Sequence, residues 1–314
     1  MRVVVLAGGV GGAKLAHGLQ QVLAPGDLTV IVNTGDDLVL HGLRVSPDLD
    51  TVMYTLASLD APTGWGVRDE SWNASDMLAR YGAPTWFALG DRDLATHVFR
   101  TARLAAGSTL SAVTDTLRRA LGVPSAILPM TDDDVRTEVC TDAGWLEFQD
   151  WFVGRRHADP VSEVRFRGIE RARPAGETLA AISSAEVVAV APSNPFVSVG
   201  TILALPGLLD ALLASAAPVV AVSPIVAGAA IKGPADRMLE SLGGEASAFG
   251  VARLYVERYP GLLDRFVLDV RDQDAEARIA ALGVRTLTAD TIMSDEAGRA
   301  RVARAVLDAA RPAP

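Results

Sequence analysis

Short apolar runs alternate along this chain with segments whose apolar residues have helical spacing. The runs lie at residues 3–6, 28–32, 187–191, 219–222 and 266–270. A strand that is apolar on both faces is typical of a parallel sheet covered by helices on both sides. The pattern therefore predicts an α/β fold with a Rossmann-like, doubly wound and mainly parallel sheet.

Helical spacing is clearest at residues 14–23, 94–106, 110–121 and 295–310. We expect the last of these to be a surface helix that closes the fold. Residues from about 70 to 185 differ from the rest, because they contain four of the five tryptophans. We predict a single α/β domain over residues 1–314, with an inserted, mainly helical lobe at about 70–185.

The composition limits the possible functions. The 314 residues are 49% hydrophobic and 21% charged, which is typical of a globular protein. A net charge of −9 argues against binding to nucleic acid, and a polyphosphate ligand would need a divalent cation or well-placed arginines. One cysteine, Cys140, excludes an internal disulfide, and four histidines make a zinc site a poor fit. No signal peptide or membrane-spanning run is evident, so we expect a cytoplasmic protein.

The first apolar run ends in a glycine-rich turn made of Gly8, Gly9, Gly11 and Gly12, with Lys14 at the start of the predicted helix. A strand, a glycine turn and a helix together present backbone N–H groups to an anion. The turn therefore predicts a phosphate-binding loop, and a merely tight connection is the alternative. Its spacing matches neither GxxxxGK[ST] nor GxGxxG followed by a ribose-binding acid, so the nucleotide class stays open.

Two pairs of acidic residues follow. Asp36 and Asp37 come directly after the second run, and Asp48 and Asp50 lie in the next polar segment. Ligands bind at the carboxyl ends of parallel strands, and Mg²⁺ takes one or two carboxylates together with phosphate oxygens and water. The pairs indicate a Mg²⁺ site. The alternative is that they are solvated or cap helices, with Asp50 or Thr51 capping a helix over residues 52–56.

The densest polar cluster spans residues 90–97, Gly-Asp-Arg-Asp-Leu-Ala-Thr-His. Arg92 could donate two hydrogen bonds to a phosphate or a carboxylate, and His97 lies about one turn further along the predicted helix. The alternative is an Asp-capped helix in which Arg92 pairs with a neighbouring acid and His97 is structural.

Polar loops also follow two of the later runs. Ser193 and Asn194 could bind a base, a ribose or a phosphate, and Ser223 follows the next run. Lys232 is a candidate phosphate contact, with an ordinary exposed lysine as the alternative. Cys140 lies outside these motifs, and we interpret it as a packed apolar residue.

In their order, and over nearly the full length, these motifs resemble one family: 2-phospho-L-lactate transferase and its actinobacterial version, phosphoenolpyruvate transferase. These enzymes serve the biosynthesis of a deazaflavin redox coenzyme. Each motif is weak alone, but the ordered set is specific. The matching segments are residues 8–12, 33–37, 46–51, 90–97, 127–132, 148–149, 191–195 and 223–225.

The resemblance implies a transfer reaction. A guanylylated three-carbon acid, either lactyl or enolpyruvyl diphosphoguanosine, donates its phosphoryl-linked acid to the ribityl hydroxyl of the deazaflavin precursor Fo, and GMP leaves. It also implies Mg²⁺ held by Asp36 with one or both of Asp48 and Asp50, and an Fo site formed by Asp50, Arg92 and His97. Asp48, Asp50 and Arg92 are the candidate catalytic residues, and Asp50 is our candidate to accept the hydroxyl proton. The donor would bind at Gly8, Gly9, Gly11, Gly12, Lys14, Ser193, Asn194 and Ser223.

The alternative function is that of a regulator without transfer chemistry. UDP-sugar-binding regulators of carbon metabolism resemble this chain in their glycine-rich start and acidic loop. The second acidic pair and the cluster at residues 90–97 favour the enzyme. The two donors differ only in their three-carbon unit, and a composition rich in Ala, Arg and Gly favours the enolpyruvyl one. The family resemblance also implies a homodimer, which is the commonest oligomer.

Overall fold

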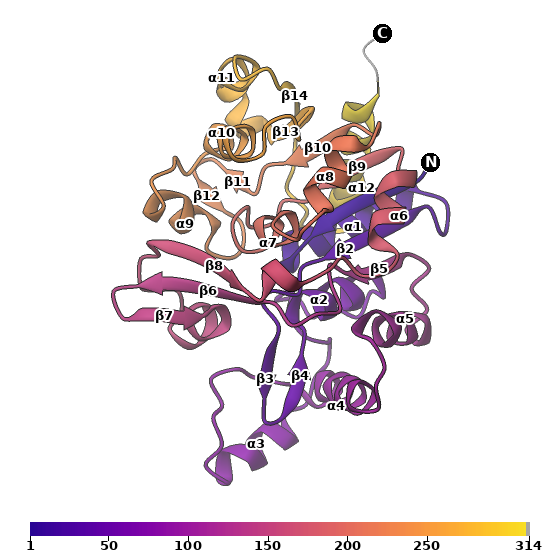
Figure 1. Cartoon of the computed structure of the whole chain (residues 1–314), viewed down its shortest axis with the longest axis vertical. Coiled ribbons are helices and arrows are strands. Elements are labelled where there is room, and N and C mark those ends of the chain that lie inside the picture. The colour runs from indigo at the N-terminus through magenta and orange to yellow at the C-terminus, as the bar shows by residue number, and fades with distance from the viewer. Residues whose placement is uncertain (312–314) are drawn as a thin grey trace.

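The computed structural model describes residues 1–311 and has a seven-stranded parallel sheet at its centre, in the order β14-β13-β10-β9-β1-β2-β5 (Figure 1). The predicted α/β fold with a doubly wound parallel sheet is confirmed. The strands are β1 Val3–Ala7, β2 Leu28–Val32, β5 Ala126–Pro129, β9 Val187–Val190, β10 Val219–Val222, β13 Arg265–Asp269 and β14 Arg285–Ala289.

The strand order reverses next to β1. The chain first adds β2 and β5 on one side of β1 and then places β9, β10, β13 and β14 on the other. At such a point the loops that follow the two central strands, here β1 and β9, leave in different directions and open a crevice at the carboxyl edge of the sheet. The topology therefore places the glycine turn beside the loop that contains Ser193 and Asn194.

Alternating residues of the buried strands divide the core into two layers. Val3 and Val5 belong to the layer formed with helices α1, α2 and α12, while Val4 and Leu6 belong to the layer formed with α6, α7, α8 and α10. This accounts for strands that are apolar at every position. The helices are α1 Gly9–Val22, α2 Pro47–Leu56, α6 Thr178–Ser184, α7 Val199–Leu203, α8 Leu208–Ala214, α9 Ala235–Ser241, α10 Ala248–Arg258, α11 Glu276–Ala280 and α12 Glu296–Ala310, with a 3-10 helix η3 at Val270–Ala275.

The predicted helix at residues 295–310 is α12, which begins after its cap residue Asp295. It packs along α1, where a Cβ at Gly18 would clash with the carbonyl of Arg299. Helix α12 is thus packed closely against α1 on one face. No helix in residues 1–311 is both long and apolar enough to cross a membrane.

The segment at residues 70–185 is less helical than predicted. Its first part contains α3 Asn73–Arg80, α4 Asp91–Ala105 and α5 Leu110–Ala120, but β5 belongs to the central sheet. The second part forms an antiparallel sheet of β6 Arg136–Thr141, β7 Gly144–Glu147 and β8 Glu163–Arg167. Strands β6 and β8 alternate between more and less buried residues, as strands with one solvated face do, so they contain no apolar run to reveal them.

Several short strands and helices lie between the larger elements. The hairpin of β3 and β4 projects from the sheet toward α3 and α4 (Figure 1). A π-helix η1 follows β7, and a small hairpin follows β10. These elements are β3 Leu38–Leu40, β4 Leu43–Val45, η1 Asp150–Gly154, the 3-10 helix η2 Ile169–Arg171, β11 Ile225–Val226 and β12 Ala229–Ala230.

Candidate active site

A cavity of about 730 Å³ lies where the loops after β1, β2 and β9 meet. Helices α2 and α4 and the π-helix η1 contribute further lining residues. The volume is within the range of pockets that bind small molecules and cofactors. Among the residues predicted for the site, the lining includes Gly8, Gly9, Gly11, Asp36, Asp48, Asp50, His97, Ser193 and Asn194.

The glycine turn is part of a helix. Helix α1 begins at Gly9, five residues before the predicted start at Lys14, so its N-terminus faces the cavity. A Cβ at Gly11 would clash with the carbonyl oxygen of Pro192, and one at Gly12 would lie 2.8 Å from Ser193 Oγ. These two glycines allow the helix to pack against the loop after β9. Gly9, whose φ is +60°, adopts a conformation that glycine favours.

Asp48 connects the loops that follow β1 and β2, and it lines the cavity. Its Oδ1 accepts a hydrogen bond from the N–H of Gly9 at 2.8 Å, and its Oδ2 accepts one from Asn33 Nδ2 at 2.9 Å. Helix α2 begins at Pro47, five residues earlier than predicted, because proline is favoured in the first turn of a helix. Asp48 and Asp50 therefore lie in the first turn of α2, and neither Asp50 nor Thr51 caps it.

Asp36 and Asp48 are two buried carboxylates close enough to affect each other. Burial raises the pKa of Asp48 to about 6, against the hydrogen bonds from Asn33 and Gly9. Burial and the neighbouring charge of Asp48 hold the pKa of Asp36 well above its ordinary value. Within residues 1–311, Asp36 Oδ1 is buried and has no hydrogen-bond partner. Two adjacent carboxylates with an unpartnered oxygen fit a divalent cation. The neighbouring Asp37 does not line the cavity, and its Oδ2 accepts a hydrogen bond from Ser46 Oγ at 2.6 Å.

Asp50 is held by an arginine that the sequence analysis missed. Arg100, on α4, is 1% exposed and binds both carboxylate oxygens of Asp50: Nη1 lies 3.0 Å from Oδ2, and Nη2 contacts Oδ1. Nη1 also lies 3.2 Å from His97 Nδ1. Such a two-point contact fixes the carboxylate plane. Asp50 thus reaches the cavity as a preoriented carboxylate.

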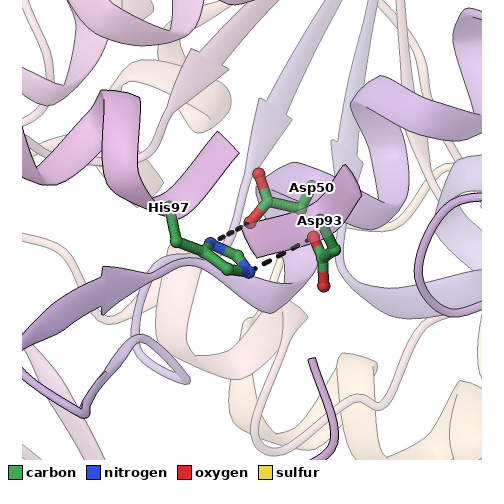
Figure 2. Close-up of side chains that lie close together, drawn as sticks. All are labelled: Asp50, Asp93 and His97. Carbon is green, nitrogen blue, oxygen red and sulfur yellow. Dashed lines mark ion pairs between the residues drawn. The ribbon is translucent and has the colours of Figure 1, made fainter. Parts of the chain in front are cut away.

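His97 links Asp50 to a second acid, Asp93 (Figure 2). Its Nδ1 lies 3.6 Å from Asp50 Oδ2, and its Nε2 lies 3.2 Å from Asp93 Oδ1. Tyr54 donates a hydrogen bond to the same Asp93 oxygen at 2.8 Å. These acids and His97 offer metal-ligand atoms within 4.8 Å of one another, but Arg100 and Tyr54 already donate to them. The two acids of this cluster therefore have protein donors, whereas His97 Nε2 is buried and makes no hydrogen bond within residues 1–311.

Arg92 lies away from the cavity in this structure. Its side chain is exposed, its Nη1 donates to the carbonyl of Arg68 at 2.9 Å, and its N–H donates to Glu70 Oε2 at 2.8 Å. Arg92 is not among the lining residues. The arginine that contacts Asp50 is Arg100.

The remaining predicted donor residues divide into two groups. Ser193 exchanges hydrogen bonds with the N–H and C=O of Gly8, at 3.1 and 2.7 Å, and lines the cavity together with Asn194. Gly12, Lys14 and Ser223 are not among the lining residues. Ser223 Oγ donates to the carbonyl of Ile225 at 2.7 Å, which stabilises a local turn.

One side of the cavity is aromatic. We call Trp65, Phe148, Phe152 and His157 the aromatic wall. Phe148 and Phe152 stack with centroids 5.4 Å apart, Phe152 and His157 with centroids 5.2 Å apart, and Trp65 meets Phe152 edge-on. Sequence reasoning did not assign these side chains to the site, because they come from two segments, around residue 65 and at residues 148–157, that only the fold brings together. Such a wall provides a surface on which a planar ring can stack.

Comparison with known proteins identifies the family. The family model described as 2-phospho-L-lactate transferase CofD matches residues 3–307. The phosphoenolpyruvate transferase of Streptomyces coelicolor is 45% identical over 98% of this chain and 97% of its own length. That of Mycobacterium avium is 42% identical over the full length of both chains.

A solved structure shows the same fold. The crystal structure of a protein member of the UPF0052 family from Bacillus halodurans matches with a TM-score of 0.66, over 98% of each chain and at 16% identity. At this identity the likeness concerns the fold. The family match over nearly the whole chain and the relatives at 42–45% identity carry the assignment: this chain belongs to the 2-phospho-L-lactate transferase CofD family and is a transferase enzyme.

Proposed function

We propose that the enzyme transfers a phosphoenolpyruvyl group from enolpyruvyl diphosphoguanosine to the deazaflavin precursor Fo. The terminal ribityl hydroxyl of Fo attacks the distal phosphorus of the donor. The bond from that phosphorus to the bridging oxygen breaks, and GMP leaves with that oxygen. The hydroxyl proton passes to a base of the protein. Reactions of this class depend on positioning and on neutralisation of charge at the phosphates.

The observation that carries the proposal is the pair of buried carboxylates, Asp36 and Asp48, beside the N-terminus of α1. The pair would hold Mg²⁺, and the helix end offers partial positive charge to the same diphosphate. A bound Mg²⁺ would withdraw negative charge from the phosphates during transfer. The Asp48 carboxylate is fixed for this task by Gly9 and Asn33.

Asp50 is our candidate to accept the hydroxyl proton. Asp50 lies two residues after Asp48 in α2 and lines the same cavity, and Arg100 fixes the orientation of its carboxylate. A positioned carboxylate within reach of the attacking hydroxyl is the usual general base for such a step. Asp50 and His97 would contact the acceptor. We do not extend that role to Arg92, whose guanidinium is engaged outside the cavity.

The choice of donor follows the relatives. Those at 42–45% identity are named phosphoenolpyruvate transferases, which supports the enolpyruvyl donor over the lactyl one. The reaction brings two planar rings together, guanine and deazaflavin. The aromatic wall supports this, because it offers apolar stacking surface inside the same cavity.

The test compares donors on one protein. Purified enzyme with Mg²⁺ and Fo is given enolpyruvyl or lactyl diphosphoguanosine, and the products are separated by chromatography with deazaflavin fluorescence. We expect faster turnover with the enolpyruvyl donor, loss of turnover in Asp50→Asn, and normal turnover in Asp142→Asn. Asp142 is an exposed control outside the cavity. Binding of a UDP-sugar without any transfer to Fo would instead support the regulator.

A further inference from the structure

The backbone after the π-helix η1 has an unusual conformation. Arg156 and His157 are consecutive non-glycine residues with φ of +53° and +43°. Residues other than glycine rarely adopt this left-handed conformation, and π-helical turns and backbone strain are both frequent at functional sites. The conformation is held by hydrogen bonds from the N–H of Arg155 to the carbonyl of Asp150 and from the N–H of His157 to the carbonyl of Trp151, each 2.8 Å long.

As a result of this conformation, the side chains of Arg155, Arg156 and His157 lie in three different surroundings. Arg155 forms a two-point ion pair with Asp159, at 2.6 and 2.9 Å, and does not line the cavity. The ring of His157 stacks on Phe152 in the aromatic wall. Arg156 lines the cavity, and no carboxylate in residues 1–311 lies within ion-pair distance of it. The strained turn therefore presents one arginine, and not its neighbour, to the ligand space.

The charges around the cavity make Arg156 distinctive. Six acidic residues line it: Asp36, Asp48, Asp50, Asp69, Glu70 and Asp93. The other long cationic side chain in the lining belongs to Lys232, whose ammonium donates to the carbonyl of Thr63 at 3.1 Å and lies 4.9 Å from the ring of Trp65. Arg156 is thus the lining cation whose side chain makes no hydrogen bond or ion pair within residues 1–311.

We propose that Arg156 binds an oxyanion of the guanylylated donor and is a substrate-recognition residue of this enzyme. The guanidinium fork matches the two oxygens of a carboxylate or of a phosphate, so the shared chemistry is a planar two-point contact with an oxyanion. The oxyanion belongs either to the carboxylate of the three-carbon acid or to the diphosphate. This inference rests on the proposed function for the identity of the donor.

The test uses neighbouring arginines as a matched pair. Arg156→Ala and Arg155→Ala are each titrated by calorimetry, in the presence of Mg²⁺, with GDP and with enolpyruvyl diphosphoguanosine. We expect the dissociation constant of the donor to rise roughly 10- to 100-fold in Arg156→Ala, as for loss of a charge-assisted contact, and less than about 2-fold in Arg155→Ala. Arg156→Lys should lie between, since it keeps the charge but not the fork.

The two ligands identify the oxyanion. If the affinity for GDP falls together with that for the donor, Arg156 binds the diphosphate. If only the affinity for the donor falls, it binds the carboxylate. Arg156→Gly, which accommodates the positive φ, provides the same loss of side chain without backbone strain and keeps the test valid if the alanine variant folds poorly.

Equal affinities in Arg156→Ala, Arg156→Gly and Arg155→Ala would overturn the inference. Because the readout is binding, it is separate from the proposed function. A parent protein that binds the donor but transfers nothing to Fo would contradict the function, whereas loss of binding in the Arg156 variants would still support the recognition role.

Discussion

Replacement of Arg100 by methionine is the sharpest test of how the site is held together. Methionine retains much of the apolar stem but removes every donor. The change leaves the Asp50 carboxylate, which is 4% exposed, without its two-point partner. It also removes the donor 3.2 Å from His97 Nδ1. A buried charge and a buried ring nitrogen would both lose their partner in a region with little access to water.

The expected loss in the free energy of unfolding follows from the burial of this ion pair. Removing one partner of a buried ion pair costs about 3–5 kcal/mol, because the remaining charge keeps its desolvation cost. The exposed pair of Arg155 and Asp159, spaced i,i+4, gives a matched comparison. Solvent-exposed ion pairs are worth about 0.2–1 kcal/mol. We therefore expect Arg100→Met to reduce the free energy of unfolding several times more than Arg155→Met.

Denaturant unfolding of the two variants measures this difference. The double variant Asp50→Asn with Arg100→Met should regain part of the lost stability, since a neutral amide replaces the buried charge. Transfer activity, measured at a temperature where each variant is folded, should fall in Arg100→Met and not in Arg155→Met. Equal losses of stability in the two single variants would refute the view that Arg100 holds Asp50 in place.

Three further predictions concern the cation and the glycine turn. Asp36→Asn should leave the protein folded but abolish transfer and the Mg²⁺-induced rise in Tm, and a parent that is fully active in excess EDTA would contradict the metal site. The raised pKa of Asp48, about 6, means that the unfolded chain loses its proton first. Metal-free protein should therefore lose about 3 kcal/mol of stability between about pH 4 and pH 6. Mg²⁺ competes with that proton, so its effect on Tm should be larger at pH 7.5 than at pH 5, and equal effects would contradict this. Gly11→Ala should lower Tm more than Gly9→Ala, because its Cβ would clash with the carbonyl oxygen of Pro192. At Gly9 the cost comes from the φ of +60°, about 1–2 kcal/mol for a residue with a Cβ, since the nearest atom is 3.7 Å away. Calorimetry of GDP binding to Gly9→Ala then shows whether a side chain there also limits ligand approach.

The central sheet could be predicted from the sequence wherever its strands are apolar on both faces. Strands β5 and β14 were missed for different reasons. β5 is a short Ala-Ile-Leu-Pro segment, and β14 is an edge strand, Arg-Thr-Leu-Thr-Ala, whose residues are exposed or half-buried. Neither segment therefore stands out from the sequence around it. β5 is fixed by pairing with β2, which is far away in sequence, and β14 by pairing with β13.

The candidate site was predictable where loops follow the central strands. Gly8, Gly9 and Gly11 of the glycine turn and the acids Asp36, Asp48 and Asp50 reach the cavity. Arg92 does not, for a reason of helix geometry. Asp93, His97 and Arg100 are spaced i, i+4 and i+7 and share one face of α4, whereas Arg92 lies about 100° away from Asp93 around the helix. The spacing of Asp93, His97 and Arg100 would have indicated that Arg100 faces the site. An arginine within a predicted helix, however, is typical of a solvated face.

The most direct test of the proposed reaction is to identify whether GMP or phosphoenolpyruvate is released. Enzyme, Mg²⁺, Fo and enolpyruvyl diphosphoguanosine are combined, and the products are identified by mass spectrometry. Attack at the distal phosphorus predicts free GMP in equal amount to an Fo derivative that carries the phosphoenolpyruvyl group. Free phosphoenolpyruvate together with guanylylated Fo would show attack at the other phosphorus and would contradict the account.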